Sequence, residues 1–272
     1  MAFTAYWIEE GRSVFVDFGG QNVREPAAQA GFPRSGDFWK LPPQAQDKQQ
    51  HFFQRSFFMA FPRNNKGPYK RRDVPHWDYS DATQHISFRL SDSLPQSQLE
   101  RLKKQVEEYP PLLQSTYLHR EIEEWIHQGA GSCILSIPEL AQCVIDTLNL
   151  SNEKCYHLYQ WVVMPNHIHV LINEFPQNPL GDVVKSWKHY TSMSFDKILL
   201  NLKSSSRFRN GYIENIINTF HGNYWIVDYW DVMIQSNRQF RIVSKYIANN
   251  PVNACLVDKP EDYPWSSSYR PR

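Results

Sequence analysis

The sequence predicts an α+β fold, with a mainly antiparallel sheet and helices packed on it. Three observations lead to this class: an alternating apolar segment at 84–90, amphipathic helical patterns between 96 and 150, and two adjacent runs rich in β-branched residues around residue 165. The order is strand, helices, strand, helix and then adjacent strands. That order implies an α+β domain, because the sheet is built mainly from antiparallel neighbours.

Length and composition set outer limits on the function. A chain of 272 residues can bury a sizeable core, as one domain with extensions or as two small domains. A net charge of +1 gives no global nucleic-acid signature, so any DNA contact must come from local patches. The four cysteines are widely spaced, which indicates neither a zinc ribbon nor a disulfide framework. With no apolar run of membrane-spanning length and no signal pattern, we expect a cytoplasmic protein with no membrane partner.

Residues 1–75 are interpreted as an N-terminal extension and residues 76–272 as the main domain. A short hairpin is expected at 5–18, followed by an irregular arm at 19–50. Residues 51–61 are rich in phenylalanine, and 63–72 carry five basic residues and no acid, ending in Arg71 and Arg72. Such a segment can contact phosphates and stack bases. The alternative is an apolar segment that packs on the main domain beside a solvated basic loop.

The first half of the main domain carries one strand and three helices. Residues 84–90 alternate polar and apolar side chains, as in a half-buried strand. Helices are expected at 96–109, where Pro110 ends the pattern, at about 115–127, and from Pro138 onward. A glycine-rich turn at 129–131 leads into a predicted short strand at 132–135.

The second half opens with two strands, at 155–163 and 168–173. A long helix follows at 180–200, with an apolar stripe that packs on the sheet. The last helix is expected at 238–249, ended by the Asn-Asn-Pro sequence at 249–251.

His167 and His169 stand at the start of the second of these strands, directly after a Pro-Asn pair. Residues i and i+2 of a strand project from the same face, so two imidazoles at this spacing can converge on one cation. Ile168 then points into the core. Taken alone, the pair is equally compatible with structural histidines.

The sequence around these histidines resembles a known family. Residues 164–169, Met-Pro-Asn-His-Ile-His, are similar to the metal-binding strand of the HUH nuclease superfamily, specifically the REP-associated tyrosine transposases and related single-strand insertion-sequence transposases. Segments 88–95, 129–135, 222–231, 246–254 and 262–267 also resemble motifs of that family, so the likeness covers roughly residues 70–270. It implies an HUH nuclease-like, ferredoxin-like sandwich, in which the motifs from 246 onward are structural.

The resemblance also implies a set of site residues. Residues 186–191 are similar to the family's Trp-Lys-x-Tyr-Thr segment, which makes Tyr190 the expected catalytic nucleophile; an ordinary partly buried tyrosine is the alternative. His167 and His169 would bind Mg²⁺ or Mn²⁺. Such a hard cation needs a further oxygen ligand, which the family usually places about one turn beyond the tyrosine. Position 194 is serine here, so Asp196 is the expected third ligand.

The predicted function is that of a metal-dependent single-stranded DNA transposase or endonuclease. It would act on hairpin-forming repeats through a 5′-phosphotyrosine intermediate, as a monomer or homodimer. A non-cleaving DNA-binding protein of the same fold is the alternative, and a zinc hydrolase of small molecules is disfavoured by the lack of a His-x-Asp-His run at 173–188. Basic residues expected to contact DNA, unless they only form solvated surface, are Lys185, Lys188, Lys203, Arg207, Arg209, Arg71 and Arg72.

Overall fold

The computed structural model of the protein describes residues 4–9, 12–17, 69–71, 74–76, 81–203, 208 and 211–271. The chain divides into two compact units, one formed by residues 1–61 with 205–209 and the other by residues 62–204 with 210–272. In the first unit, strands β1 (Thr4–Glu9) and β2 (Arg12–Asp17) pair antiparallel and form the predicted hairpin. The aromatic segment 51–61 lies outside the described residues.

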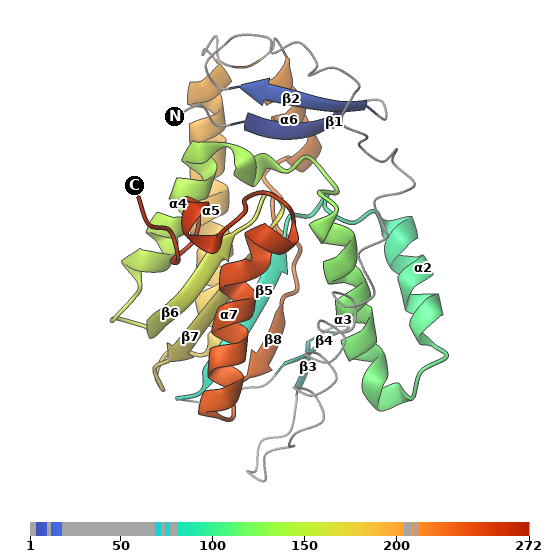
Figure 1. The fold of residues 1–272 in the computed structure, drawn as a ribbon, viewed down its shortest axis with the longest axis vertical. Coiled ribbons are helices and arrows are strands. Elements are labelled where there is room, and N and C mark those ends of the chain that lie inside the picture. Colours follow the sequence, from blue (N-terminus) through green and yellow to red (C-terminus); the bar gives the residue numbers. More distant parts are fainter. Residues whose placement is uncertain are drawn as a thin grey trace. The chain divides into compact units, whose positions relative to one another are not determined.

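The second unit is built on a four-stranded sheet. Its strands are β5 (Thr83–Arg89), β6 (Tyr156–Val163), β7 (His167–Glu174) and β8 (Trp230–Met233). Their order is β6-β7-β5-β8, and every neighbouring pair is antiparallel (Figure 1). Two short strands, β3 (Tyr69–Arg71) and β4 (Val74–His76), form a separate antiparallel pair. The prediction of an α+β fold with a mainly antiparallel sheet is confirmed.

The helices of this unit largely follow the expected pattern. They are α2 (Gln96–Val106), α3 (Pro111–His127), α4 (Pro138–Leu150), α5 (Leu180–Lys203), α6 (Tyr212–Phe220) and α7 (Asn237–Asn253), with short 3-10 helices η1 (Ile134–Ser136) and η2 (Pro260–Asp262). Among the described residues, no helix combines the length and the apolar character that crossing a membrane requires.

The expected short strand at 132–135 is wrong, because η1 begins there. Cys133 has a φ of 52°, in the left-handed region, so the backbone cannot run on as an extended strand. The Leu135 amide donates to Pro165 O, at 3.1 Å, and not to a strand ladder. This bond ties η1 to the turn between β6 and β7.

Two helix boundaries also differ from the prediction, and both involve proline. Helix α3 begins at Pro111, at a first-turn position where the missing N–H costs no hydrogen bond. Helix α7 does not end at 249–251 but continues through Pro251 to Asn253. The Ala254 amide donates to Asn250 O, at 3.0 Å, and the Leu256 amide to Pro251 O, at 2.9 Å. The last turn therefore closes although Pro251 itself donates nothing.

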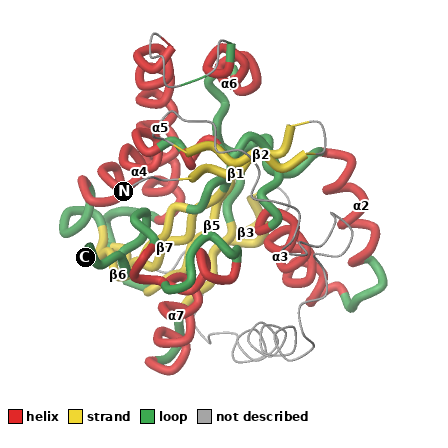
Figure 2. Tube along the Cα trace, turned by 45° about the horizontal axis from the view of Figure 1, so that its top comes forward, coloured by secondary structure: helices red, strands yellow, loops and turns green. Residues whose placement is uncertain are grey.

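Strand β7 presents different chemistry on its two faces. Ile168, Val170 and Ile172 are fully buried on one face, on the side of the sheet where α4 and α5 pack. Trp187 of α5 stacks on Phe88 of β5 and donates its indole N–H to Tyr156 Oη, at 2.9 Å. The histidines face the other way, where α7 crosses the sheet (Figure 2). The apolar core thus holds the strand that positions the polar cluster.

Candidate metal centre and nucleophile

The structure places His167 and His169 on the same face of β7, as the i, i+2 spacing predicts. The tight connection before them is closed by the Met164 amide, which donates to His167 O at 2.9 Å. The two rings lie 4.9 Å apart between centroids, nearly perpendicular, and their exposed fractions are only 1% and 0%. Both imidazoles are therefore fixed by buried strand backbone.

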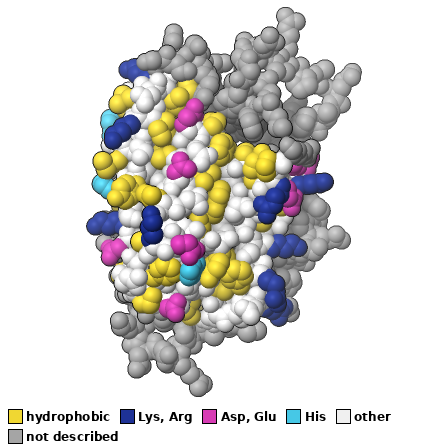
Figure 3. Space-filling model, turned by 90° about the vertical axis from the view of Figure 1, so that its left-hand side faces the viewer, with side chains coloured by type: hydrophobic (Ala, Val, Ile, Leu, Met, Phe, Trp, Pro, Cys, Tyr) yellow, Lys and Arg dark blue, Asp and Glu magenta, His cyan; other side chains and the backbone are white. Residues whose placement is uncertain are grey.

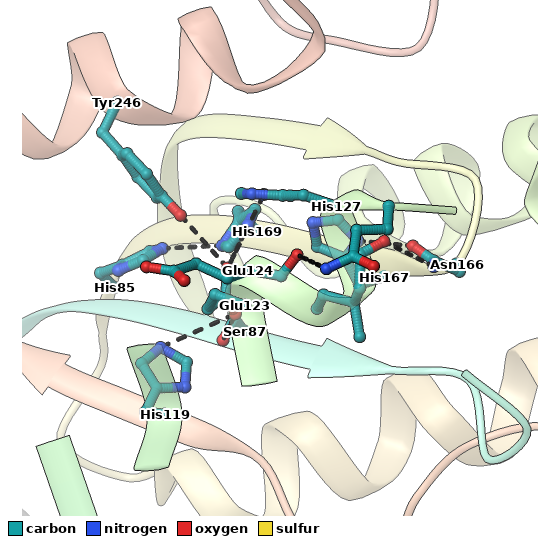
Figure 4. Close-up of polar contacts among 12 residues, drawn as sticks. His85, Ser87, His119, Glu123, Glu124, His127, Asn166, His167, His169 and Tyr246 are labelled. Carbon is teal, nitrogen blue, oxygen red and sulfur yellow. Dashed lines mark hydrogen bonds and ion pairs between the residues drawn. The ribbon is translucent and has the colours of Figure 1, made fainter. Parts of the chain in front are cut away.

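Helix α3 brings two further metal-ligating side chains to this face. Glu123 and His127 are four residues apart, so they project from the same side of the helix. One ligand atom from each of Glu123, His127, His167 and His169 lies within 4.8 Å of all the others (Figure 4). Sequence reasoning missed both residues, because charged and polar positions of a helix ordinarily face solvent.

Hydrogen bonds orient the strand histidines. Asn166 donates its side-chain N–H groups to Ile126 O, at 2.8 Å, and Ala130 O, at 2.9 Å. Its Oδ1 is therefore the atom 2.7 Å from His167 Nδ1, and His167 must donate from that nitrogen. On His169, Nδ1 lies 3.2 Å from His85 Nε2. These contacts leave Nε2 of both strand histidines directed toward the cluster.

The Nε2 atoms of His127, His167 and His169 are buried, and none makes a hydrogen bond of good geometry within the described part of the chain. Buried polar atoms without such a bond are rare in folded proteins. Three of them, converging beside a carboxylate, are the arrangement that a divalent cation would satisfy. The residues present therefore fit a metal ion.

The protonation states of the histidines and of Glu123 also favour a metal ion at this cluster. Burial lowers the pKa of His167 and of His127, so both rings are neutral near pH 7, as metal ligands must be. Burial alone would raise the pKa of Glu123, but His169 and His119 outweigh it and hold the pKa well below its ordinary value. Glu123 is therefore a carboxylate, and its Oε2 lies 3.3 Å from His169 Nε2.

Tyr246 and Asn250 of α7 complete the cluster. The Tyr246 hydroxyl donates to Glu123 Oε2, at 3.2 Å, and its ring centroid is 5.4 Å from that of His169. Burial, with the charge of Glu123 added, raises the pKa of Tyr246 well above its ordinary value. Asn250, one turn further on, is fully buried, and its side chain raises the pKa of His167 and His127 against the effect of burial.

Sequence reasoning assigned residues 246–254 a structural role and so missed this tyrosine. A signal was present: Tyr246 and Asn250 are an i, i+4 pair, which places both on one helix face. A tyrosine with an oxygen ligand one turn beyond it is the arrangement that the resemblance implied around Tyr190.

Tyr190 and Asp196 lie elsewhere. Helix α5 packs on the opposite face of the sheet from the histidines, and Tyr190 is 56% exposed, in a surface pocket that it shares with Cys143 and Asp146 of α4. Asp196 Oδ1 accepts a hydrogen bond from Tyr224 Oη, at 2.6 Å, and does not belong to the four-residue group. Within one chain, the structure does not bring either residue to the histidines.

The basic residues expected to contact DNA differ in their exposure and in the contacts that they make. Lys188 turns inward, and its Nζ donates to the carbonyls of residues 226–228 at 2.7–3.2 Å. Lys185 is exposed, whereas Lys203 Nζ lies 3.2 Å from Glu214 Oε1. Arg72, Arg207 and Arg209 lie outside the described residues, and Arg71 is described only as part of β3. On the face drawn in Figure 3, basic and acidic side chains are interspersed.

Comparison with known proteins bears on the identity of this domain. A family model described as "Transposase IS200 like" matches residues 146–250, a stretch that includes His167, His169, Tyr246 and Asn250. The match confirms the resemblance drawn from the sequence and supports a transposase function. No curated protein matches the chain.

Two solved structures are similar to parts of it. A REP-associated tyrosine transposase bound to a REP hairpin is 15% identical, with 72% of this chain and 81% of that chain covered and a TM-score of 0.40. A presumed transposase from Deinococcus radiodurans R1 is 16% identical, with 67% and 97% covered and a TM-score of 0.29.

Proposed function

Because residues 146–250 match a family model described as "Transposase IS200 like", we propose that this protein cleaves and rejoins single-stranded DNA, with Tyr246 as the nucleophile and a divalent cation held by His167, His169 and Asn250. One observation carries the proposal: the Tyr246 hydroxyl lies within the cluster that contains both strand histidines and Glu123. The substrate class follows from the family, and hairpin-forming repeats are the proposed targets. This assignment takes Tyr246 in place of Tyr190, and the oxygen of Asn250 in place of Asp196.

The chain's own groups prepare the reaction. Tyr246 is held by its hydrogen bond to Glu123, so its hydroxyl points at the histidines and not to solvent. With its pKa raised, the tyrosine is fully protonated near pH 7 and is a weak nucleophile by itself. When bound, a divalent cation supplies positive charge that polarises the scissile phosphate and favours the phenolate.

In the first step, Tyr246 Oη forms a bond to the phosphorus atom and gives its proton to Glu123, which already accepts its hydrogen bond. The bond from phosphorus to the 3′-oxygen breaks, and this oxygen takes a proton from solvent. The products are a 5′-phosphotyrosyl strand and a free 3′-hydroxyl. Attack by another 3′-hydroxyl then reverses the chemistry and rejoins the DNA without an external energy source.

The test is an adduct assay with single-stranded hairpin DNA labelled on the 3′ side of the cleavage position, in the presence of Mg²⁺ or Mn²⁺. Wild type should give a protein-linked band on a denaturing gel, and Tyr246→Phe should not, because only the hydroxyl is removed. Tyr190→Phe is the matched control and should keep the band. If Tyr190→Phe alone abolishes the band, Tyr190 is the nucleophile. DNA binding without any adduct would support the non-cleaving alternative.

A further inference from the structure

We infer that helix α3 supplies two additional metal ligands, Glu123 and His127, and that the completed site takes a transition-metal ion such as Zn²⁺, Co²⁺ or Mn²⁺ in preference to Mg²⁺. The inference deepens the proposed function, since it rests on the same cation site at His167 and His169.

The spacing of the donor atoms supports this role. Two ligands with metal bonds of about 2.0–2.2 Å lie about 3.0–3.4 Å apart on one ion. His169 Nε2 and Glu123 Oε2 are separated by 3.3 Å, and His127 Nε2 is 4.0 Å from the same oxygen. Glu123 and His127 are thus placed as neighbouring ligands, with His127 slightly beyond the ideal separation. Because a carboxylate has two oxygens, Glu123 can bind a metal through Oε2 and keep the hydrogen bond from Ser87 at Oε1.

The fold prepares α3 for this task. Asn166, which orients His167, also binds the carbonyls of Ile126 and Ala130 on either side of the helix end. The turn that precedes the histidine strand and the end of α3 are thereby held together by one side chain. His127 Nε2 is buried and makes no hydrogen bond of good geometry among the described residues. The same atom of a surface histidine would bind water, so a buried Nε2 in this state is suited to a metal ion.

A purely structural role does not explain why the Glu123 carboxylate is buried. A buried carboxylate is costly unless a cation or several donors compensate it. Its oxygens accept from Ser87 Oγ, at 3.3 Å, and from Tyr246 Oη, at 3.2 Å, both neutral donors. The imidazoles of His169, at 3.3 Å, and His119, at 3.7 Å, are also close to these oxygens. Arg89 on the same sheet face directs its guanidinium to Ser93 Oγ, at 3.0 Å. A bound divalent cation would supply the positive charge that best compensates this carboxylate.

The donor set determines the class of metal. Mg²⁺ prefers oxygen ligands in octahedral geometry and keeps several waters. Imidazole nitrogen suits Zn²⁺, Co²⁺ and other transition ions, and a site with three imidazoles and one carboxylate is rich in nitrogen. With His127 included, nitrogen donors outnumber oxygen donors around the cluster. With the strand histidines alone, they would not dominate the site in this way.

The test measures metal binding without DNA or turnover. Full-length protein, freed of metal with a chelator, is titrated calorimetrically with Zn²⁺, Mn²⁺ and Mg²⁺. The wild type should bind one Zn²⁺ and prefer it strongly to Mg²⁺. Loss of partners outside the ligand shell costs about 10–100-fold in affinity, so His127→Ala and Glu123→Gln should each weaken Zn²⁺ binding by about 100-fold or more. His157→Ala, a change at a half-exposed histidine of β6 paired with Glu153, should bind as the wild type does.

Other outcomes separate this inference from the proposed function. Unchanged Zn²⁺ affinity in both α3 variants would overturn the inference, even if Tyr246 still forms a DNA adduct. Absence of any adduct would overturn the proposed function and leave the metal result intact. If His127→Ala does not fold, as judged by circular dichroism, His127→Gln takes its place. The visible spectrum of the Co²⁺-loaded wild type gives an answer without any variant: the weak bands of a six-coordinate, oxygen-rich site would contradict the inference.

Discussion

Asn166→Ala is the change that tests most directly how the fold supports the site. Asn166 is 1% exposed and joins two elements through its amide. It donates to Ile126 O and Ala130 O at the end of α3, and it accepts from His167 Nδ1 at 2.7 Å. Removal of the amide therefore loosens α3 from the turn and frees His167 to rotate.

The expected loss of stability follows from the bonds removed. Three hydrogen bonds with a net contribution of about 1 kcal/mol each give about 3 kcal/mol. For a chain of this size, about 2–4 °C of melting temperature corresponds to each kcal/mol, so Tm should fall by about 6–12 °C. Because Asn166 fixes which nitrogen of His167 faces the cluster, metal affinity should fall by about 10–100-fold as well.

Urea denaturation of the metal-free protein measures the first effect, and calorimetric metal titration of the folded variant measures the second. Asn249→Ala is the control, since among the described residues that amide makes one hydrogen bond, to Lys245 O at 2.7 Å, within α7. A variant as stable as Asn249→Ala, with wild-type metal affinity, would refute the role assigned to Asn166.

Three further predictions concern other parts of the domain. Gly131→Ala should destabilise the protein by about 1–3 kcal/mol in urea denaturation, because Gly131 has a φ of +87° and a Cβ there would lie 2.9 Å from Ser93 Cα. Lys188→Met should lower stability by about 2–3 kcal/mol through its lost bonds to residues 226–228, yet leave the DNA affinity of the folded protein unchanged in gel shifts. Burial lowers the pKa of His119 to about 4, so its unfolded form, with a pKa of 6.5, binds the proton first as pH falls. Stability should therefore be lost between pH 6.5 and 4, by about 2 kcal/mol at pH 5 for this residue, and His119→Gln should flatten the pH profile of urea midpoints.

The sheet could be predicted because the residue pattern of each strand is contained within that strand's own sequence. The strands at 84–90, 155–163 and 168–173 carry alternation or β-branched runs that no competing interaction overrides. The predicted end of the last helix, at 249–251, is too early. A proline usually breaks a helix, whereas the missing donor of Pro251 falls in the final turn of α7. The left-handed Cys133 gives no signal in the sequence, since the conformation is imposed by contacts with the turn at 165.

Only the part of the site that lies on a single strand, the two histidines of β7, could be predicted from the sequence. The His-x-His spacing gives the face of β7, but Glu123, His127 and Tyr246 reach that face from helices far away in the sequence. In α3, Glu123 sits among charged neighbours and looks like solvent-facing surface, and only the packed structure shows it to be 4% exposed. Tyr190 met the family pattern locally, but α5 is on the opposite face of the sheet.

The identity of the linked tyrosine tests the central claim most directly. Protein–DNA adduct formed on hairpin DNA is trimmed with nuclease and digested with trypsin, and cleavage after Lys188, Lys197 and Lys245 separates the two tyrosines. Mass spectrometry should find the nucleotide on the peptide that begins at Tyr246. A nucleotide on the peptide at 189–197, which contains Tyr190, would contradict the assignment of the nucleophile to the buried histidine cluster.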